Sequence, residues 1–287
     1  MYLEELKAVG DDIDPDVLDD IERLCLGRRK RSNTPKAISA RRYHSCTATL
    51  VAAVFTDRDP LPAFGNHLAE VALVGRSNAG KSSLLNALCG DRPHQGAASV
   101  SATPGWTSSL HFYELCEATH TAGEEGVQMV LVDLPGYGYA STGAARQKHW
   151  AKATRKYLRT RTQLACAFVL IDATLGITAD DERFLDVLDS LRVPYHGVLT
   201  KADLLAPLEL AQSYKLVSQR VTEREHYAGG DLPICSARNA AGVAELWERL
   251  KLGVLHLPPY QAEGCRYVGE DGSSSEFLRD AVRVSGE

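Results

Sequence analysis

The stretch that decides the fold is residues 70–83, which read EVALVGRSNAGKSS. Its first five residues form a short run of the kind that makes a buried strand. Gly75, Gly80, Lys81 and Ser82 then follow in the spacing GxxxxGK(S/T), and a helical pattern begins directly afterwards. A strand, a glycine-containing loop and a helix in this order predict a phosphate-binding loop.

The residue types in this loop suit a chain of phosphates. Glycines let backbone N–H groups wrap around the phosphates, and the helix adds the positive end of its dipole. Lys81 would neutralise charge on the β- and γ-phosphates, and the Ser82 hydroxyl would bind Mg²⁺. Arg76 is part of the loop, but nothing in the sequence brings it near the γ-phosphate, so it is expected to have a structural role there and not a catalytic one. The residues expected to contact the nucleotide here are Gly75, Arg76, Ser77, Asn78, Ala79, Gly80, Lys81, Ser82 and Ser83.

Two later apolar runs, residues 195–199 and 232–235, end in polar segments. Because the carboxyl ends of parallel strands meet at one edge of a sheet, these segments are expected to lie beside the base. The Asp203 carboxylate could accept hydrogen bonds from N1–H and the N2 amino group of guanine, whereas adenine has no such pair of donors. A backbone N–H near Ala237 could donate to guanine O6, so GTP is favoured over ATP, although Asp203 could also cap the helix that follows. The residues expected at the base are Thr200, Lys201, Asp203, Cys235, Ser236 and Ala237.

A further apolar run, residues 127–132, ends in Asp133, Leu134, Pro135 and Gly136. In this DxxG arrangement the aspartate holds Mg²⁺ and the glycine N–H meets the γ-phosphate. Hydrolysis removes that contact, which makes the segment a candidate switch. All four residues are expected at the nucleotide.

Composition limits what the chain can do. Its 287 residues contain 32 Lys and Arg against 37 Asp and Glu, which gives a net charge of −5 and excludes binding to nucleic acid by overall positive charge. Any contact with RNA must come from a local patch, and DNA is not an expected partner. No run of about 18 apolar residues occurs, so no membrane partner is expected either. The seven cysteines are scattered without metal-ligand spacing, which favours free thiols.

Apolar runs alternate with helical patterns from Glu70 to His256, which is typical of a parallel α/β sheet. The predicted strands are residues 71–74, 110–115, 127–132, 165–171, 195–199 and 232–235.

Several longer motifs occur together and in order: GRSNAGKSSLLNAL, TPGWTSSLHFYEL, DLPGYGYA, LIDATLGITADD and TKADLL, with Trp150, Tyr157 and Arg161 between them. In these motifs the chain resembles the EngB (YihA) ribosome-assembly GTPases over about residues 70–255. The resemblance implies an α/β P-loop G domain, with a six-stranded, mostly parallel sheet and helices on both faces. It also implies Mg²⁺-dependent hydrolysis of GTP to GDP and phosphate, in support of large ribosomal subunit assembly. The expected division is an N-terminal extension (1–65), a G domain (66–257) and a flexible C-terminal tail (258–287).

The resemblance places the first switch on residues 103–108. Gly105, Trp106 and Thr107 would then contact the nucleotide, and Thr107 would be a second Mg²⁺ ligand. Trp106 and Ser108 stand where the family has Arg and Gln, which leaves open a role of this switch in RNA or transition-state contacts. The implied metal ligands are Ser82, Thr107 and Asp133. The implied catalytic residues are Lys81, Thr107 and Gly136.

Hydrolysis is expected to be slow without a partner, because residue 137 is Tyr where Ras-like proteins have the Gln that orients water. Asn78 stands where related GTPases bind K⁺, and a K⁺ ion there could supply positive charge. The alternative is that Asn78 simply suits a tight turn.

Lys148, Lys152, Arg155 and Arg159 are spaced to lie within about 60° on one helical face, with Trp150 on the opposite face. This basic stripe is the candidate surface for ribosomal RNA phosphates, and the alternative is an ordinary solvated face. Away from the ribosome the protein is expected to be monomeric. The alternative functions are a small signalling GTPase acting on a protein effector, a nucleotide-dependent scaffold that does not hydrolyse GTP, and a P-loop kinase of small molecules, which the TKAD and DLPG motifs disfavour.

The N-terminal region changes charge along its length. Residues 1–24 carry nine acidic residues, whereas residues 25–56 carry none and are rich in Arg. The Arg-rich part suggests a targeting segment or a nucleic-acid-binding arm, or else a solvated extension. It favours the mitochondrial matrix as the location, although the acidic start does not fit a presequence, and a bacterial cytoplasm is the alternative.

Overall fold

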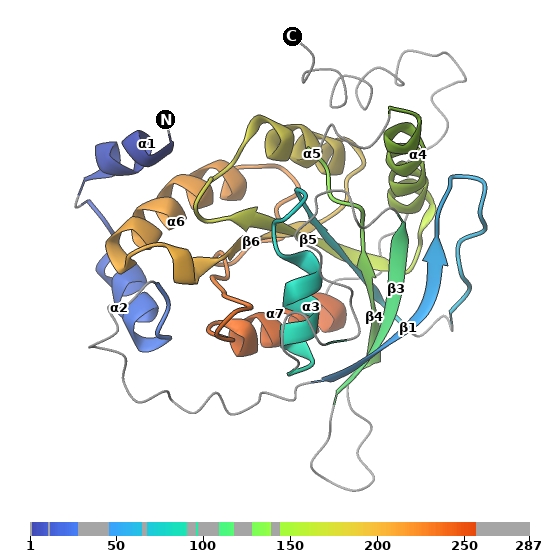
Figure 1. Cartoon of the computed structure of the whole chain (residues 1–287), viewed down its shortest axis with the longest axis horizontal. Coiled ribbons are helices and arrows are strands. Elements are labelled where there is room, and N and C mark those ends of the chain that lie inside the picture. Colours follow the sequence, from blue (N-terminus) through green and yellow to red (C-terminus); the bar gives the residue numbers. More distant parts are fainter. Residues whose placement is uncertain are drawn as a thin grey trace, which may run out of the picture.

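A computed structural model describes residues 2–10, 12–27, 46–64, 68–90, 96, 109–117, 128–138 and 144–256. A six-stranded sheet runs through them in the order β1-β3-β4-β2-β5-β6 (Figure 1). Its strands are β1 (Cys46–Val54), β2 (Glu70–Gly75), β3 (Leu110–Glu117), β4 (Gln128–Asp133), β5 (Leu164–Asp172) and β6 (Tyr195–Thr200). The β2–β4, β2–β5 and β5–β6 pairs are parallel, and β3 is antiparallel to both of its neighbours. The predicted class, a mostly parallel α/β sheet, is confirmed.

Helices cover both faces of the sheet. They are α1 (Tyr2–Val9), α2 (Pro15–Arg23), α3 (Lys81–Leu88), α4 (Ala144–Thr160), α5 (Ala179–Ser190), α6 (Pro207–Thr222) and α7 (Val243–His256), with a short 3₁₀ helix η2 (Ala202–Leu204).

The alternation of side chains along β2 sorts these helices into two layers. Val71 and Leu73 pack in one core cluster with apolar residues of α3 and α7. Ala72 and Val74 point to the other side, where they share a cluster with residues of α4, α5 and α6. The central strand is therefore buried on both faces, as expected for a parallel sheet between helices.

The sixth strand is not the predicted one. Residues 232–235 form only an isolated bridge between Leu199 and Ile234. Pro233 has no N–H with which to extend a ladder there. The sheet is completed instead by β1, which pairs antiparallel with β3. The expected boundary at residue 65 is therefore wrong, because β1 lies within the segment assigned to an extension.

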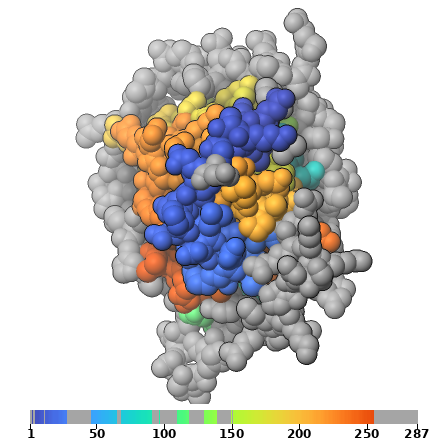
Figure 2. Space-filling model, turned by 90° about the vertical axis from the view of Figure 1, so that its left-hand side faces the viewer, coloured from blue at the N-terminus to red at the C-terminus, as the bar shows by residue number. Residues whose placement is uncertain are grey.

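The acidic N-terminal region also belongs to the folded part of the chain. It forms α1 and α2, which lie over α6 (Figure 2). Leu6, Ile21 and Leu26 are buried there. Asp14 caps α2 by accepting a hydrogen bond from the Asp16 N–H at 3.0 Å. The acidic charges remain on the outer surface while the apolar side chains pack inward.

Two segments singled out in the sequence are not among the residues that the structure describes. The Arg-rich residues 28–42 and the expected tail at 258–287 lie outside the described residues. Within the described ranges, no helix has both the length and the apolar character needed to cross a membrane.

Candidate nucleotide-binding site

The predicted phosphate-binding loop joins β2 to α3. Gly80 stands at the N-cap of α3 with φ +100°, so the helix begins without a side-chain cap. Its first N–H groups thus keep the orientation that suits an anion. The Lys81 side chain is buried, and its Nζ lies 3.4 Å from the Gly75 carbonyl oxygen. Burial lowers the pKa of Lys81, and the charge of Asp133 opposes that shift.

Asp133 ends β4 beside the loop, in register with Leu73 of β2. The Ser82 hydroxyl donates to its Oδ2 at 3.2 Å. Its Oδ1 is buried without a hydrogen-bond partner among the described residues. Burial raises the pKa of this carboxyl group, and Lys81 opposes the shift.

An unpartnered carboxylate oxygen beside a serine hydroxyl fits a small divalent cation. The described residues contain no cluster of three or more His, Cys, Asp or Glu side chains that could hold a metal ion. Besides the expected ligand Thr107, which lies outside the described residues, phosphate and water oxygens would complete the set, as is common for Mg²⁺ beside a nucleotide.

The DLPG segment lies against the loop. The Ser77 N–H donates to the Tyr137 carbonyl oxygen at 3.0 Å. A Cβ on Gly136 would lie 2.7 Å from the Ser77 nitrogen, so only glycine fits at this position. The Leu134 side chain is buried in the core, which leaves its backbone as the part that can contact a ligand.

Tyr137 points into the protein. Its hydroxyl donates to Asp181 Oδ1 at 2.9 Å, and its ring stacks on Phe184 with centroids 4.7 Å apart. Asp181 in turn accepts from both the N–H and the hydroxyl of Thr178 at the start of α5. This connection between the candidate switch and α5 was not predicted from the sequence.

Five of the six residues expected at the base, all but Ser236, line a cavity of about 560 Å³. It is lined by Gly80, Ser83, Leu84, Thr200, Lys201, Asp203, Leu204, Cys235, Ala237 and Arg238. The Ser236 hydroxyl donates to Asp203 Oδ1 at 2.6 Å, which fixes that carboxylate. The Thr200 hydroxyl bonds the Ala79 carbonyl oxygen at 2.8 Å and so ties the end of β6 to the phosphate-binding loop.

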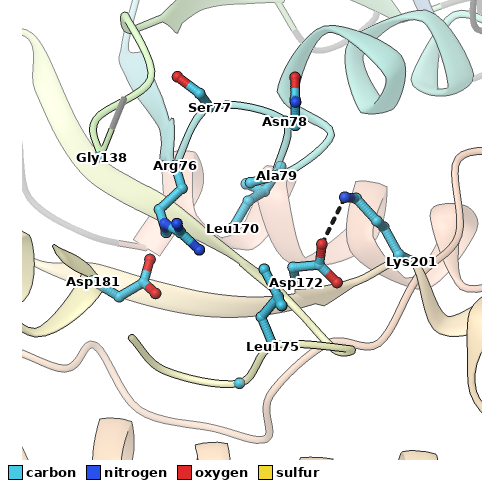
Figure 3. A pocket seen from close by; sticks show the side chains of 11 residues that line it. Arg76, Ser77, Asn78, Ala79, Gly138, Leu170, Asp172, Leu175, Asp181 and Lys201 are labelled. Atoms are coloured by element: carbon cyan, nitrogen blue, oxygen red, sulfur yellow. Dashed lines mark hydrogen bonds and ion pairs between the residues drawn. The ribbon is translucent and has the colours of Figure 1, made fainter. Parts of the chain in front are cut away.

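A second cavity of about 230 Å³ lies behind the loop (Figure 3). Arg76 points toward Asp181 in this view, whereas Asn78 points the opposite way. The Arg76 Nε lies 3.9 Å from Asp180 Oδ2. Asn78 is exposed and has φ +67°, the left-handed conformation in which Asn is well tolerated.

Lys201 borders both cavities, and its Nζ donates to Asp172 Oδ2 at 2.6 Å. Asp172 was not among the predicted site residues. It does, however, end a buried strand, and ligands of such sheets bind at the carboxyl ends of the strands.

The structure thus brings the phosphate-binding loop, the DLPG segment (residues 133–136) and the TKAD segment (residues 200–203) to one edge of the sheet. The first-switch residues Gly105, Trp106 and Thr107 lie outside the described residues.

The predicted basic stripe lies on α4. Lys152 and Arg159 are exposed and Arg155 is half-buried, while the side chains of Lys148 and Trp150 lie outside the described part. On the inner side, the Tyr157 hydroxyl donates to buried Glu70 at 3.1 Å.

This arrangement defines a P-loop GTPase domain. A family model described as "50S ribosome-binding GTPase" matches residues 70–201. The chain is 43% identical over 178 residues to a probable GTP-binding protein EngB of Rhodopseudomonas palustris (strain BisB18), covering 62% of this chain and 76% of that protein. The chain belongs to the EngB family of GTP-binding proteins, and it is a GTPase whose family links it to the ribosome.

A second curated relative and one solved structure are also similar to this chain. A probable EngB of Sinorhizobium medicae (strain WSM419) is 38% identical over 189 residues, covering 64% of this chain and 83% of that protein. The crystal structure of Era in complex with MgGDPNP and nucleotides 1506–1542 of 16S ribosomal RNA has a TM-score of 0.53 and 22% identity. That comparison covers 71% of this chain and 60% of Era, and it shows the shared fold.

Proposed function

We propose that this GTPase assists assembly of the large ribosomal subunit by binding it in one nucleotide state and leaving it in the other. The observation that carries the proposal is the bond between the Ser77 N–H and the Tyr137 carbonyl oxygen, which holds the DLPG segment against the phosphate-binding loop. A γ-phosphate would meet the chain at this point, shortly before α4 begins at Ala144. The description of the matching family model supports the choice of the large subunit.

We assign the roles within the site as follows. Lys81 binds the β- and γ-phosphates, and the Gly136 N–H donates to the γ-phosphate. Asp203 accepts from the guanine edge while Lys201 lies beside it. Ser82, Asp133 and Thr107 would hold Mg²⁺, which when bound neutralises charge on the β- and γ-phosphate oxygens.

Hydrolysis in this site depends on electrostatics more than on a side-chain base. Water attacks the γ-phosphorus, the bond to the bridging oxygen breaks, and GDP and phosphate result. The Tyr137 hydroxyl donates its proton to Asp181, so it is not free to donate to that water. Lys81 stabilises the negative charge that moves toward the β-phosphate, so turnover without a partner is expected to be slow.

Asn78 is proposed to help hold a K⁺ ion against the phosphates. Its exposed side chain lies on the loop itself, but its left-handed backbone equally suits a role in the turn. Measuring GTP turnover in KCl and in NaCl separates the two. Faster turnover in KCl supports the ion site, and equal rates leave Asn78 with the role in the turn.

The RNA-contacting surface is proposed to be the basic stripe of α4, Lys148, Lys152, Arg155 and Arg159. The exposed ends of Lys152 and Arg159 support it, because exposed cations can reach phosphates without losing a buried partner.

Co-sedimentation with large ribosomal subunits tests both the function and this surface. The wild-type protein should bind in a non-hydrolysable GTP analogue and be released in GDP. Reversing the charges of Lys152 and Arg159 to Glu should weaken binding, while Arg220→Glu on α6, an exposed control, should not. Absence of binding in either nucleotide state contradicts the proposal and favours a signalling GTPase with a protein effector.

For the location we propose a bacterial cytoplasm over the mitochondrial matrix. The reported relatives are bacterial proteins. In addition, α2 buries Ile21 against the rest of the fold, which a cleaved targeting segment would not do. Mass spectrometry of the native protein tests this, because retention of residues 2–27 is expected and their removal would favour organellar import.

A further inference from the structure

A chain of hydrogen bonds leads from the N-terminal helix to the turn after β5. The Ser213 hydroxyl of α6 is buried and donates to the Ala173 carbonyl oxygen at 2.9 Å. The Tyr2 hydroxyl lies 2.8 Å from Ser213 Oγ. Serine has a single hydroxyl proton, and Ser213 donates it in the hydrogen bond to the Ala173 carbonyl oxygen. Tyr2 is therefore the donor in the bond between Tyr2 and Ser213. A tyrosine hydroxyl, with its ordinary pKa of about 10, keeps that proton at neutral pH, and burial raises the pKa of Tyr2 further.

The ring of Tyr2 also lies directly on this turn. Gly176 has φ +62°, and a Cβ there would come within 2.2 Å of the Tyr2 ring. Any larger residue at 176 would therefore displace Tyr2. Leu175 and Gly176 donate their N–H groups to the Asp172 carbonyl oxygen at 3.0 and 2.9 Å. The turn that Tyr2 covers is thus the turn that begins at Asp172.

The side chain of Asp172 connects this turn to the nucleotide site. Its Oδ1 accepts from the N–H and the hydroxyl of Thr174 at 3.0 and 2.7 Å, which orients the carboxylate. Its Oδ2 accepts from Lys201 Nζ at 2.6 Å. Lys201 lines the cavity that also contains Asp203, where the base is expected. Figure 3 shows this Asp172–Lys201 pair at the border of the second cavity.

Other contacts fasten the N-terminal helices without reaching this turn. Gln212 donates its amide to the Gly10 carbonyl oxygen at 2.9 Å. Lys215 pairs with Asp12 at 2.7 Å in an exposed position. Figure 2 shows the N-terminal helices lying over α6, where these contacts are made. They provide a control, because they hold the same segment at a different place.

We propose that Tyr2 is a positioning residue for nucleotide binding: through Ser213 and the turn 172–176 it fixes Asp172 against Lys201 and so slows the release of guanine nucleotides. The proposal rests on the guanine-nucleotide binding described above and adds a role for the N-terminal helix in it. Lys201 lies on the base side of the site, and GDP and a GTP analogue carry the same base. The release rates of both nucleotides should therefore change by the same factor.

The test is the dissociation rate of a fluorescent GDP, measured in the full chain by stopped flow. Tyr2→Phe keeps the ring against Gly176 and removes only the hydroxyl, so the rate should rise about two- to tenfold, the range expected for one hydrogen bond. Ser213→Ala removes both bonds and should raise the rate at least as much. Lys215→Met should leave the rate unchanged. A GTP analogue should be released faster by the same factor as GDP.

The outcomes are distinct. An unchanged rate in both Tyr2→Phe and Ser213→Ala overturns the proposal, even if the melting temperature falls. An equal rise in Lys215→Met also overturns it, because the effect would then come from general loosening of the segment. If the wild-type chain does not bind GDP at all, the nucleotide-binding assignment fails instead.

Discussion

Replacing Tyr137, which directly follows the DLPG segment, with Phe removes a hydroxyl that ties this part of the chain to α5. That hydroxyl donates to Asp181 Oδ1 at 2.9 Å, and Asp181 is only 2% exposed, so water cannot easily take its place. The stack on Phe184 is retained, and no large cavity forms. Loss of a hydrogen bond to a buried carboxylate lowers the free energy of unfolding by about 1.5–3 kcal/mol. For a domain of this size that corresponds to a melting temperature lower by about 3–12 °C.

The same change should alter nucleotide preference. The Tyr137 carbonyl oxygen accepts a hydrogen bond from the Ser77 N–H, which holds the neighbouring Gly136 over the phosphate-binding loop. The Gly136 N–H is expected to donate to the γ-phosphate, which GDP lacks. Affinity for a GTP analogue should therefore fall relative to GDP, as measured by competition against a fluorescent nucleotide.

The matched control is Tyr157→Phe, which removes an equivalent bond to the buried carboxylate of Glu70, distant from the loop. It should cost comparable stability and leave the ratio of the two affinities unchanged. The reasoning is refuted if Tyr137→Phe leaves that ratio unchanged, or if both variants change it equally.

Three further outcomes are expected. Arg161→Met leaves the fully buried Glu70 without its charge partner. The free energy of unfolding, measured by urea titration, should fall by about 3–5 kcal/mol. A loss below about 1 kcal/mol would contradict this reasoning. Gly136→Ala places a Cβ 2.7 Å from the Ser77 nitrogen. This variant should still bind GDP but should lose the preference for a GTP analogue over GDP. An intact preference would count against the close packing of Gly136 on the loop. Burial lowers the pKa of His196 to about 4 from about 6.5 in the unfolded chain. Its contribution to stability is therefore complete above about pH 6.5 and is lost as the pH falls toward about 4. The free energy of unfolding should fall with pH across that range, and His196→Gln should make this slope shallower; an unchanged slope would contradict the expectation.

The sequence predicted the parts of the site that are local. The phosphate-binding loop joins a strand directly to a helix, so its residue spacing alone specified its shape. Asp133 and Thr200 each end a strand, and the geometry of a parallel sheet brings such ends together.

The missed features depend on contacts between distant segments. β1 is an edge strand whose side chains are largely exposed, so it lacks a clear apolar alternation, and its partner β3 lies far along the chain. Residues 232–235 showed the apolar run of a strand, yet Pro233 leaves only an isolated bridge there. Asp181 and Tyr137 meet only because α5 packs beside the DLPG segment.

The central claim is that the cavity beside Asp203 recognises guanine, and nucleotide selectivity tests it most directly. The measurement compares the affinities of GDP, ADP and xanthosine diphosphate for the wild-type chain and for Asp203→Asn. The wild type should bind GDP alone with high affinity. Asparagine offers one donor and one acceptor, which match the N1–H and the C2 oxygen of xanthine, so the variant should bind xanthosine diphosphate and lose about 100-fold or more in GDP affinity. Unchanged GDP affinity in Asp203→Asn, or equal binding of ADP and GDP by the wild type, would contradict the account.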